Sequence, residues 1–578
     1  MPVWKRYRSE IFTALILSAV IIAVWCWAYG RTTAAAWRTP LAYSGDAISV
    51  TAQAKAYLDG DILPVGWKFV KHLGVPFAAN WNDYPVTESL LFAGMGWLGR
   101  VVGLFASVNV FVFLAFLLAG ISFWFTGTAL RYRPPFVLMG AVLFAFSHFI
   151  SSRIPGHIVL AYCWHIPLLL LVTWRITGDA PPLSGAKFWL ALALSFLAGT
   201  LNPYYSFLYL QLLGLAVVRH LLRGQKGNAL VPVSLAIAVA GGFLLMNFGP
   251  ISYALEYGKN TNAVVRNMCA LNSCGLRFPA LFTPPPSHRW QLIGQFQAHF
   301  LESWGPYLGF AGATGFIWLI AVTVRLFWQG KKHFVPLFSW HALWVLVFAH
   351  VGGINTLLGL CHLYLFRCAN RYSVVLLAIS LLFLVRQLSR KCPRRWAWPV
   401  ALAITGIGLW DQLPPRITAN DITQMQRQAD TDEEFTRKIE AVLSLGAMVF
   451  QLPVADYPEI PPIHEMTDYG HFRPYLYSKN LKFSYGSNKG RPCDAWQHDI
   501  EQLLPVYMAA KLEAYGFSAI YINRRGYEDG GAKLLAALKA AGKPVLEENT
   551  DMVAVRLRPV PGAKSVLPKV IQSNWETE

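Results

Sequence analysis

Charged side chains are scarce in this chain of 578 residues, of which Asp, Glu, Lys and Arg together make up only 14%. A soluble globular protein carries about 25%. Hydrophobic residues reach 55%, and the mean hydropathy is +0.38. The apolar residues fall in runs that can cross a bilayer, which takes about 20 residues of helix. The scarcity of charge therefore excludes an ordinary soluble enzyme and predicts a polytopic membrane protein.

The chain also lacks the short motifs of several functional classes. It contains no serine-hydrolase elbow, P-loop, dinucleotide fingerprint or HExxH helix, and its eight cysteines lack the spacing of a zinc site. It has no internal repeats, and few ionisable residues fall inside the apolar runs, which argues against a proton-coupled transporter. The net charge of +19 would suggest nucleic acid in a soluble protein. Here the basic residues gather in short loops, so no nucleic-acid partner is expected.

About eleven transmembrane helices are predicted from the apolar runs. The runs are 11–29, 108–130, 135–150, 159–172, 188–201, 206–218, 230–246, 307–327, 335–352, 372–385 and 396–410. The first is longer than the core of a cleaved signal peptide, which is about 7–15 residues, so it is interpreted as a span that stays in the chain. A further apolar piece, 90–102, is broken by glycines and predicts an interfacial or re-entrant helix.

Basic residues occupy every alternate connection, and these connections are short, which predicts that they face the cytoplasm. They are Lys5, Arg6, Arg8, Arg131, Arg133, Arg175, Arg219, Arg223, Lys226, Arg325, Lys331, Lys332, Arg386, Arg390, Lys391, Arg394 and Arg395. The N-terminus is then cytoplasmic, and an odd number of spans places the C-terminus outside a bacterial cytoplasmic (inner) membrane.

The sequence divides into a membrane domain, 1–411, and a small extracytoplasmic α/β domain, 412–561, followed by a flexible tail, 562–578. The membrane domain carries two large outer loops, 30–105 and 251–306. Within the second domain, buried strands are expected at 447–454, 519–523 and 552–557, and an amphipathic helix at 532–541.

The first outer loop contains the three candidate catalytic acids, Asp46, Asp83 and Glu88. A carboxylate at the membrane surface can take the proton of an incoming hydroxyl as a general base. The alternative for Asp46 is structural, because Ser44 or Asp46 would cap a helix over 48–58. Asp59 and Asp61 form a D-x-D-like pair that could hold a divalent cation, although a turn explains them more simply.

Other polar and aromatic residues on the outer face are candidates for binding a phosphate or lining a cavity. They are Arg153 and His157 in SSRIPGH, Tyr204 and Tyr205 in NPYY, Glu302 in ESWGPYLG, and Arg367 and Arg371 in FRCANRYS. Arginine suits a phosphate by its planar fork of donors. The structural alternatives are headgroup anchoring by the arginines and an interfacial belt of tyrosines.

In order along the chain, these motifs resemble the GT-C superfamily of integral membrane glycosyltransferases. The likeness is carried by YSGDAI after the first span, PGHIVLAYCWHIPLLLL, NPYY, ESWGPYLG, FRCANRYS, and the tail segments MVFQLPV and HFRPYLYSKNL. Within the superfamily, the chain looks like the YfhO-like bacterial branch that depends on polyprenyl-phosphate sugars.

The resemblance implies a hexosyl- or pentosyltransferase acting at the outer face of the membrane. Such enzymes move a sugar from a polyprenyl-phosphate donor to a glycan, lipid or protein acceptor. Asp46 matches the acid of the first loop, and Arg367 and Arg371 match the residues that bind the donor phosphate, with Arg153 and His157 behind them. Many relatives have paired acids where Asp46 is followed by Ala47. That departure puts a divalent cation in doubt and leaves the second acid to Asp83 or Glu88.

No organic cofactor and no metal ligands are expected, because the donor phosphate is already a good leaving group. Two alternative functions stay open at this point: a transporter or flippase of a lipid-linked glycan, and a non-catalytic membrane scaffold. Membrane lipids are partners in each case.

Overall fold

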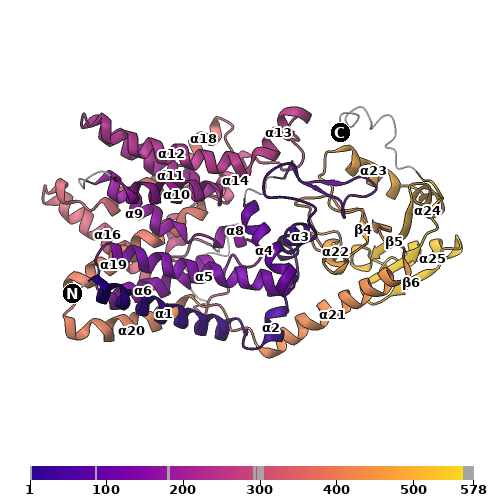
Figure 1. Cartoon of the computed structure of the whole chain (residues 1–578), viewed down its shortest axis with the longest axis horizontal. Coiled ribbons are helices and arrows are strands. Elements are labelled where there is room, and N and C mark those ends of the chain that lie inside the picture. The colour runs from indigo at the N-terminus through magenta and orange to yellow at the C-terminus, as the bar shows by residue number, and fades with distance from the viewer. Residues whose placement is uncertain (1–2, 85–87, 179–182, 291–293, 296–304, 564–578) are drawn as a thin grey trace. The chain divides into compact units, whose positions relative to one another are not determined.

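The computed structural model describes residues 3–84, 88–178, 183–290, 294–295 and 305–563, which fold into two compact units (Figure 1). The helical unit consists of Met1–Thr32, Val110–Leu245 and Arg266–Thr418. The sheet unit consists of Thr33–Asn109, Met246–Val265 and Ala419–Glu578. Each unit is assembled from three separate stretches of chain, so segments that are distant in sequence share one core.

Each of the eleven apolar runs overlaps a helix. The helices of ten or more residues in these runs are α1 (Val3–Ala28), α5 (Leu104–Ala129), α6 (Pro134–Ala145), α9 (His165–Thr177), α10 (Ala186–Gly199), α11 (Pro203–Leu222), α12 (Lys226–Met246), α16 (Gly309–Trp328), α17 (Leu337–Ala349), α19 (Ser373–Lys391) and α20 (Ala397–Gln412). Among the described residues, seven helical segments are long and apolar enough to cross a membrane. The prediction of a polytopic helical membrane protein with a small sheet domain is confirmed, while the number of spans stays a prediction.

The helix expected over 159–172 is broken into two pieces. The short helix α8 (Ile158–Ala161) ends before α9 begins at His165. Pro167 explains the new start, because a proline in the first turn of a helix loses no intrahelical hydrogen bond there. Three residues of irregular chain, 162–164, therefore separate α8 from α9.

Close helix packing in the helical unit depends on small residues. A Cβ added to Gly315 of α16 would lie 2.4 Å from the Ser380 carbonyl oxygen of α19. One added to Gly199 of α10 would lie 2.1 Å from the Val239 carbonyl oxygen of α12. No larger side chain fits at either position. Small interface residues that let two backbones approach are typical of helices that pack within a bilayer.

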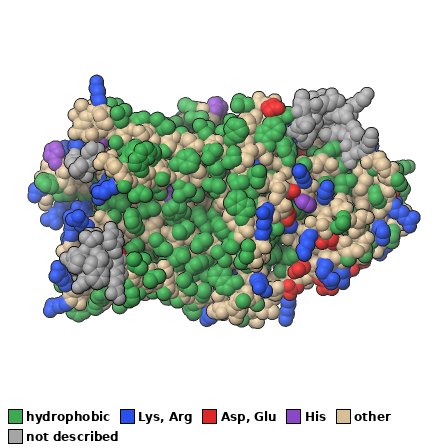
Figure 2. Space-filling model, in the orientation of Figure 1, with side chains coloured by type: hydrophobic (Ala, Val, Ile, Leu, Met, Phe, Trp, Pro, Cys, Tyr) green, Lys and Arg blue, Asp and Glu red, His purple; other side chains and the backbone are tan. Residues whose placement is uncertain are grey.

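The surface of the helical unit is mostly apolar. Figure 2 shows hydrophobic side chains over its helices, with Lys and Arg side chains gathered at the end where the N-terminus lies. On α1, the side chains of Ile11, Phe12 and Leu15 are all more than half exposed. Such a surface suits contact with lipid, whereas the orientation of the chain in the membrane stays a prediction.

The sheet unit contains a five-stranded sheet in the order β4-β3-β5-β7-β6. Its strands are β3 (Met448–Leu452), β4 (Lys482–Phe483), β5 (Phe517–Asn523), β6 (Val545–Glu548) and β7 (Met552–Arg556). β3 pairs in parallel with β4 and β5, whereas β7 is antiparallel to β5 and β6. Its helices are α21 (Ala419–Val442), α22 (Phe472–Tyr477), α23 (Pro492–Glu501), α24 (Pro505–Ala514) and α25 (Ala532–Ala540). The three expected strands and the expected helix correspond to β3, β5, β7 and α25.

The first outer loop is an integral part of this unit. The Phe483 amide donates to the His72 carbonyl at 2.9 Å, and the Val75 amide donates to the Phe483 carbonyl at 3.2 Å, so residues 72–75 lie along the edge strand β4. Val75 is buried in the same core as Phe450 and Trp496. A short hairpin of β1 (Phe69–Val70) and β2 (Ala79–Asn80) brackets this segment. The boundary predicted at 412–561 therefore encloses only part of the observed unit.

Two helices of the same loop pack tightly on each other. They are α3 (Asp46–Asp59) and α4 (Ser89–Val102), the apolar piece expected to be interfacial. A Cβ added to Gly96 of α4 would lie 2.6 Å from Cβ of Tyr57 on α3. The glycines that interrupt the apolar pattern of α4 thus serve helix packing.

Candidate functional site

Asp46 is the first residue of α3. The N-cap is Gly45, with a φ of +53° and no side-chain capping bond, so the expectation that Ser44 or Asp46 caps this helix is wrong. Glycine suits the position because a positive φ is costly for other residues. A carboxylate in the first turn of a helix is stabilised in its charged form by the helix dipole. Asp46 is half-buried in this setting.

A second carboxylate lies beside the start of α3. A Cβ added to Gly45 would be 3.6 Å from Oδ1 of Asp468, which belongs to the C-terminal part of the chain. Burial raises the pKa of Asp468. The negative charge of Asp46 contributes, after burial, to the raised pKa of Tyr469, so Asp46 also faces this segment. The sequence left the second acid to Asp83 or Glu88, and no motif marked Asp468.

A cavity of about 320 Å³ opens next to these residues. Ser44 and Ile48, which flank Asp46 in the sequence, line it, although Asp46 and Asp468 themselves do not. The rest of its wall includes Glu465, Met466, Thr467, Gly470 and Arg473, together with Asn523 at the end of β5 and Arg525 just after it. Parallel and mixed sheets commonly bind ligands outside the carboxyl ends of their strands, which is where the last two residues lie. The volume is within the range of small-molecule sites, about 300–1,000 Å³.

Buried ionic contacts hold one wall of the cavity. Arg473 donates to both oxygens of Asp432, from Nε at 2.6 Å and from Nη2 at 2.8 Å. The Tyr43 hydroxyl donates to Oδ2 of the same carboxylate at 2.7 Å. Because the Arg473 charge is already paired with Asp432, this wall offers mainly polar and apolar surface rather than a strong anion site.

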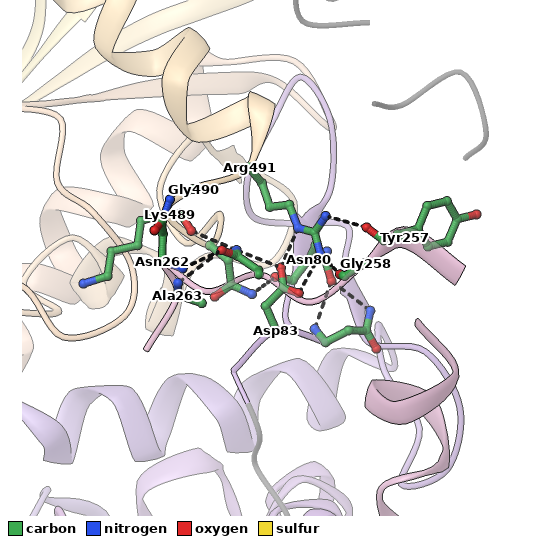
Figure 3. A network of polar contacts seen from close by, with 12 residues as sticks. Asn80, Asp83, Tyr257, Gly258, Asn262, Ala263, Lys489, Gly490 and Arg491 are labelled. Carbon is green, nitrogen blue, oxygen red and sulfur yellow. Dashed lines mark hydrogen bonds and ion pairs between the residues drawn. The ribbon is translucent and has the colours of Figure 1, made fainter. Parts of the chain in front are cut away.

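Asp83 has very different surroundings (Figure 3). Arg491 donates to its two oxygens from Nε and Nη2, both at 2.8 Å, and Asn260 Nδ2 donates to Oδ2 at 3.2 Å. Arg491 also donates to the carbonyl oxygens of Tyr257, at 3.4 Å, and Gly258, at 3.1 Å. Three hydrogen bonds, two of them from one guanidinium, hold this carboxylate in place. Asp83 therefore joins three chain segments, a structural role.

Glu88, the third predicted acid, is buried directly before α4 and close to a lysine. Lys68 Nζ donates to Ser89 Oγ at 2.6 Å. Burial lowers the pKa of Lys68 to about 8, against the opposing effect of the Glu88 charge. The proximity of these opposite charges also favours a structural role for Glu88.

Asp59 and Asp61 do not form a shared cation site. Asp59 pairs with Lys55 at 2.8 Å, whereas Asp61 pairs with His72 at 2.8 Å. Gly60 between them has a φ of +82° and ends α3 in the left-handed conformation. The simpler interpretation of this triplet, a turn, is the observed one.

The candidate phosphate-binding residues belong to the helical unit, where three of their segments converge at the N-terminus of α11. The Arg371 guanidinium lies over the Tyr204 ring, 4.7 Å from its centre, and the Cys368 amide donates to the Tyr204 hydroxyl at 3.2 Å. The Tyr205 hydroxyl donates to the Leu160 carbonyl of α8 at 2.7 Å. Arg367 precedes the short helix η4 (Ala369–Tyr372), so it does not share a helical face with Arg371.

Arg153 and His157 occupy one turn before α8. The His157 amide donates to the Arg153 carbonyl at 2.8 Å. The Arg153 side chain is almost fully buried and lies against Gly305, where an added Cβ would be 2.2 Å from Nη2. This contact explains the glycine in the ESWGPYLG segment. Glu302 of that segment lies outside the described residues.

Several residues that shape these sites were not predicted from sequence: Lys68, Asp432, Asp468, Arg473, Arg491 and Arg525. Only HFRPYLY, which contains Arg473, was singled out as a motif. Arg491 pairs with Asp83, Asp432 with Tyr43, and Asp468 lies near Gly45, each more than 200 positions away, and a single sequence contains no signal for such pairings.

No protein-family model and no curated protein matches this chain. Among solved structures, ArnT from Cupriavidus metallidurans bound to undecaprenyl phosphate is similar at 13% identity and a TM-score of 0.50, covering 94% of this chain and 97% of that one. The apo Archaeoglobus fulgidus oligosaccharyltransferase has 11% identity and a TM-score of 0.44, covering 97% of this chain and 76% of that one. ArnT is a GT-C glycosyltransferase, so the predicted GT-C fold is confirmed, whereas the YfhO-like branch stays a prediction.

Proposed function

We propose that this chain is a membrane glycosyltransferase that moves a sugar from a polyprenyl-phosphate donor to a hydroxyl of a glycan, lipid or protein acceptor. The observation that carries the proposal is the position of Asp46 at the start of α3, in a segment whose residues Ser44 and Ile48 line a cavity of about 320 Å³, in a chain with the GT-C fold over 94% of its length. The similar ArnT structure, which binds undecaprenyl phosphate, supports a polyprenyl phosphate as the lipid partner.

In the proposed reaction, Asp46 acts as general base. The acceptor hydroxyl attacks the anomeric carbon of the donor sugar, the bond from that carbon to the phosphate oxygen breaks, and Asp46 takes the hydroxyl proton. The polyprenyl phosphate leaves with the bonding electron pair. The cavity beside Asp46 is proposed to hold the acceptor, and Asp468 to keep the Asp46 segment oriented.

In the helical unit, Arg371 and Arg367 are proposed to bind the donor phosphate. The Tyr204 ring under Arg371 orients the guanidinium by a cation–π contact. Arg153 and His157 are proposed as further donors to the phosphate from the turn before α8. A bound guanidinium neutralises the charge on the leaving phosphate and so lowers the barrier to its departure.

The proposal is tested in a strain from which this chain has been deleted, by mass spectrometry of surface glycans and lipids. We expect one glycan or lipid to lose the mass of a single hexose or pentose, and wild-type protein to restore it. Asp46→Asn should insert and fold but fail to restore the sugar. Asp499→Asn, which removes an exposed carboxylate from the same unit, is the matched control and should restore it.

Purified protein tests the donor site separately. Undecaprenyl phosphate should bind the wild-type chain, and Arg371→Gln should weaken that binding at least tenfold while Asp46→Asn leaves it unchanged. An unchanged glycan profile in the deletion strain contradicts transferase activity. Accumulation of a complete glycan still linked to its lipid carrier would instead favour the transporter alternative.

A further inference from the structure

Outside the proposed transfer site, two acidic residues and a histidine converge in the sheet unit. Asp456, Asp494 and His498 each offer one ligand atom, and these atoms lie within 4.8 Å of one another. We propose that the three side chains bind one divalent transition-metal ion of the Zn²⁺ or Mn²⁺ type. The inference does not rest on the proposed transferase function.

The backbone presents two of the ligands as a pair. Asp494 and His498 are four residues apart on α23, so both side chains project from one face of the helix. Asp456 comes from the loop that follows β3 and faces them from a second element. A pair at this helical spacing completed by a third residue from elsewhere is an arrangement common to metal sites.

The distances suit a shared ion. His498 Nε2 lies 2.7 Å from Oδ1 of Asp456 and 4.0 Å from Oδ1 of Asp494. Ligand atoms that are each about 2.1 Å from one metal ion are about 3 to 3.5 Å from one another. Small rotations of these side chains, which would lengthen the first distance and shorten the second, are sufficient to place all three atoms around an ion.

The donor set selects the class of metal. One imidazole nitrogen with two carboxylate oxygens suits Zn²⁺ or Mn²⁺, whereas Mg²⁺ and Ca²⁺ prefer oxygen ligands alone. The side chains of His498 and Asp456 are 40% and 35% exposed, so an ion can enter from solvent and water can complete its coordination.

The charge of the group also favours a cation. Asp456 and Asp494 bring two carboxylates close to one another, and like charges at that distance repel. A bound divalent ion would offset that repulsion. The competing interpretation is that protonated His498 alone supplies the positive charge, as a simple ion pair with Asp456.

The ion would also support the contact network around Asp83. The Gly490 amide donates to Oδ2 of Asp494 at 3.3 Å, and the next residue, Arg491, holds Asp83 (Figure 3). Fixing Asp494 therefore fixes the segment from which Arg491 projects. We expect metal binding to stabilise the attachment of the first outer loop to the rest of the sheet unit.

Calorimetry tests the site on the full chain in detergent micelles, without a polyhistidine tag and after removal of metal by a chelator. We expect one Zn²⁺ ion to bind per chain and to raise the unfolding temperature. Asp494→Asn and His498→Ala should each weaken Zn²⁺ binding at least tenfold. Asp499→Asn, an exposed acid adjacent to His498 on the same helix, is the matched control and should bind as the wild type does.

X-ray absorption at the zinc edge tests the wild-type protein without any substitution. The expected spectrum has nitrogen and oxygen neighbours with the outer-shell signature of one imidazole. Sulfur neighbours would place the ion on cysteines and overturn the proposal. The absence of Zn²⁺ and Mn²⁺ binding, or equal binding by wild type and both ligand variants, would also overturn it and leave the ion pair as the explanation.

Discussion

Asp46 and Asp83 belong to the same outer stretch of the chain, yet their surroundings differ. Asp46 begins a helix, follows Gly45, which lies near the carboxylate of Asp468, and stands between two residues, Ser44 and Ile48, that line a cavity. Asp83 accepts hydrogen bonds from Nε and Nη2 of Arg491 and from Nδ2 of Asn260. The comparison teaches that the residue type and the loop do not decide whether a carboxylate can act as a base. Its tertiary neighbours decide, because they determine which hydrogen-bond donors already hold it.

The largest effect is expected at Asp46. Asp46→Asn removes the proposed proton acceptor and should lower sugar transfer about a thousandfold, or about 4 kcal/mol in the transition state. The unfolding temperature should change little, because Asn keeps the size and shape of Asp and because Gly45, not Asp46, occupies the N-cap of α3. Transfer assays and thermal unfolding on the same preparation measure both quantities. Near-normal transfer by this variant would remove Asp46 from the reaction.

Breaking the ion pair between Asp83 and Arg491 should lower the stability of the protein rather than its sugar transfer. Arg491→Ala leaves a buried carboxylate without its guanidinium, which should reduce the free energy of unfolding by about 3 kcal/mol. The double variant Asp83→Asn with Arg491→Gln should recover part of this loss. Denaturant unfolding gives the values, with Lys438→Gln, at an exposed ion pair, as a control expected to change little. A stable Arg491→Ala protein without transfer activity would reverse the roles assigned to these two regions.

Acidification should lower the free energy of unfolding through His471, which directly follows Gly470 in the cavity wall. His471 is buried, and burial lowers its pKa to about 4 despite its hydrogen bond with the Pro453 carbonyl at 2.7 Å. The unfolded chain takes up this proton at about pH 6.5, so the contribution of neutral His471 is complete above that pH. It declines as the pH falls toward 4, with a loss of about 2 kcal/mol at pH 5.

The difference in stability between about pH 7.5 and pH 5 measures this effect. In His471→Gln that difference should shrink, even if the variant is less stable at both values. His464→Gln, an exposed histidine of the same segment, should keep the wild-type difference. An equal acid loss in all three proteins would assign the sensitivity to other groups.

The smallest effect is expected where the outer stretch lies along β4. Val75→Ala removes two buried methyl groups from the core that contains Phe450 and Trp496, and should cost about 1.5 kcal/mol. Protease cleavage within residues 60–80 should increase to a similar degree. Leu63→Ala, at an exposed position of the same stretch, serves as control. If Val75→Ala unfolds like the wild type, the edge pairing contributes little stability.

Hydrophobic pattern predicted the local elements well. All eleven apolar runs overlap helices, and β3, β5, β7 and α25 lie where buried strands and an amphipathic helix were expected. Such elements are local, because a run of apolar residues must be covered whatever lies next to it in space. The break before α9 was missed, although Pro167 was a visible sign of it.

The candidate site was less predictable. Asp46 was identified by its place after the first span, and the arginines and tyrosines of the helical unit by their motifs. Asp468 and Arg491 were not, because their importance lies in contacts with residues hundreds of positions earlier. The sequence ranked Asp83 and Glu88 behind Asp46 without separating the two, and only the structure shows that Arg491 holds Asp83 and that Lys68 lies near Glu88.

By itself, the sequence determined that this is a membrane protein with a separate polar region. A chain with 14% charged residues and long apolar runs would expose too much apolar surface to be stable in water. The tertiary structure alone decided that residues 72–75 extend the sheet and that Arg491 pairs with Asp83 rather than Asp46. Both outcomes depend on which segments, distant in the sequence, pack against each other and bury their surfaces from water. That is a property of the folded core, and no single stretch of residues specifies it.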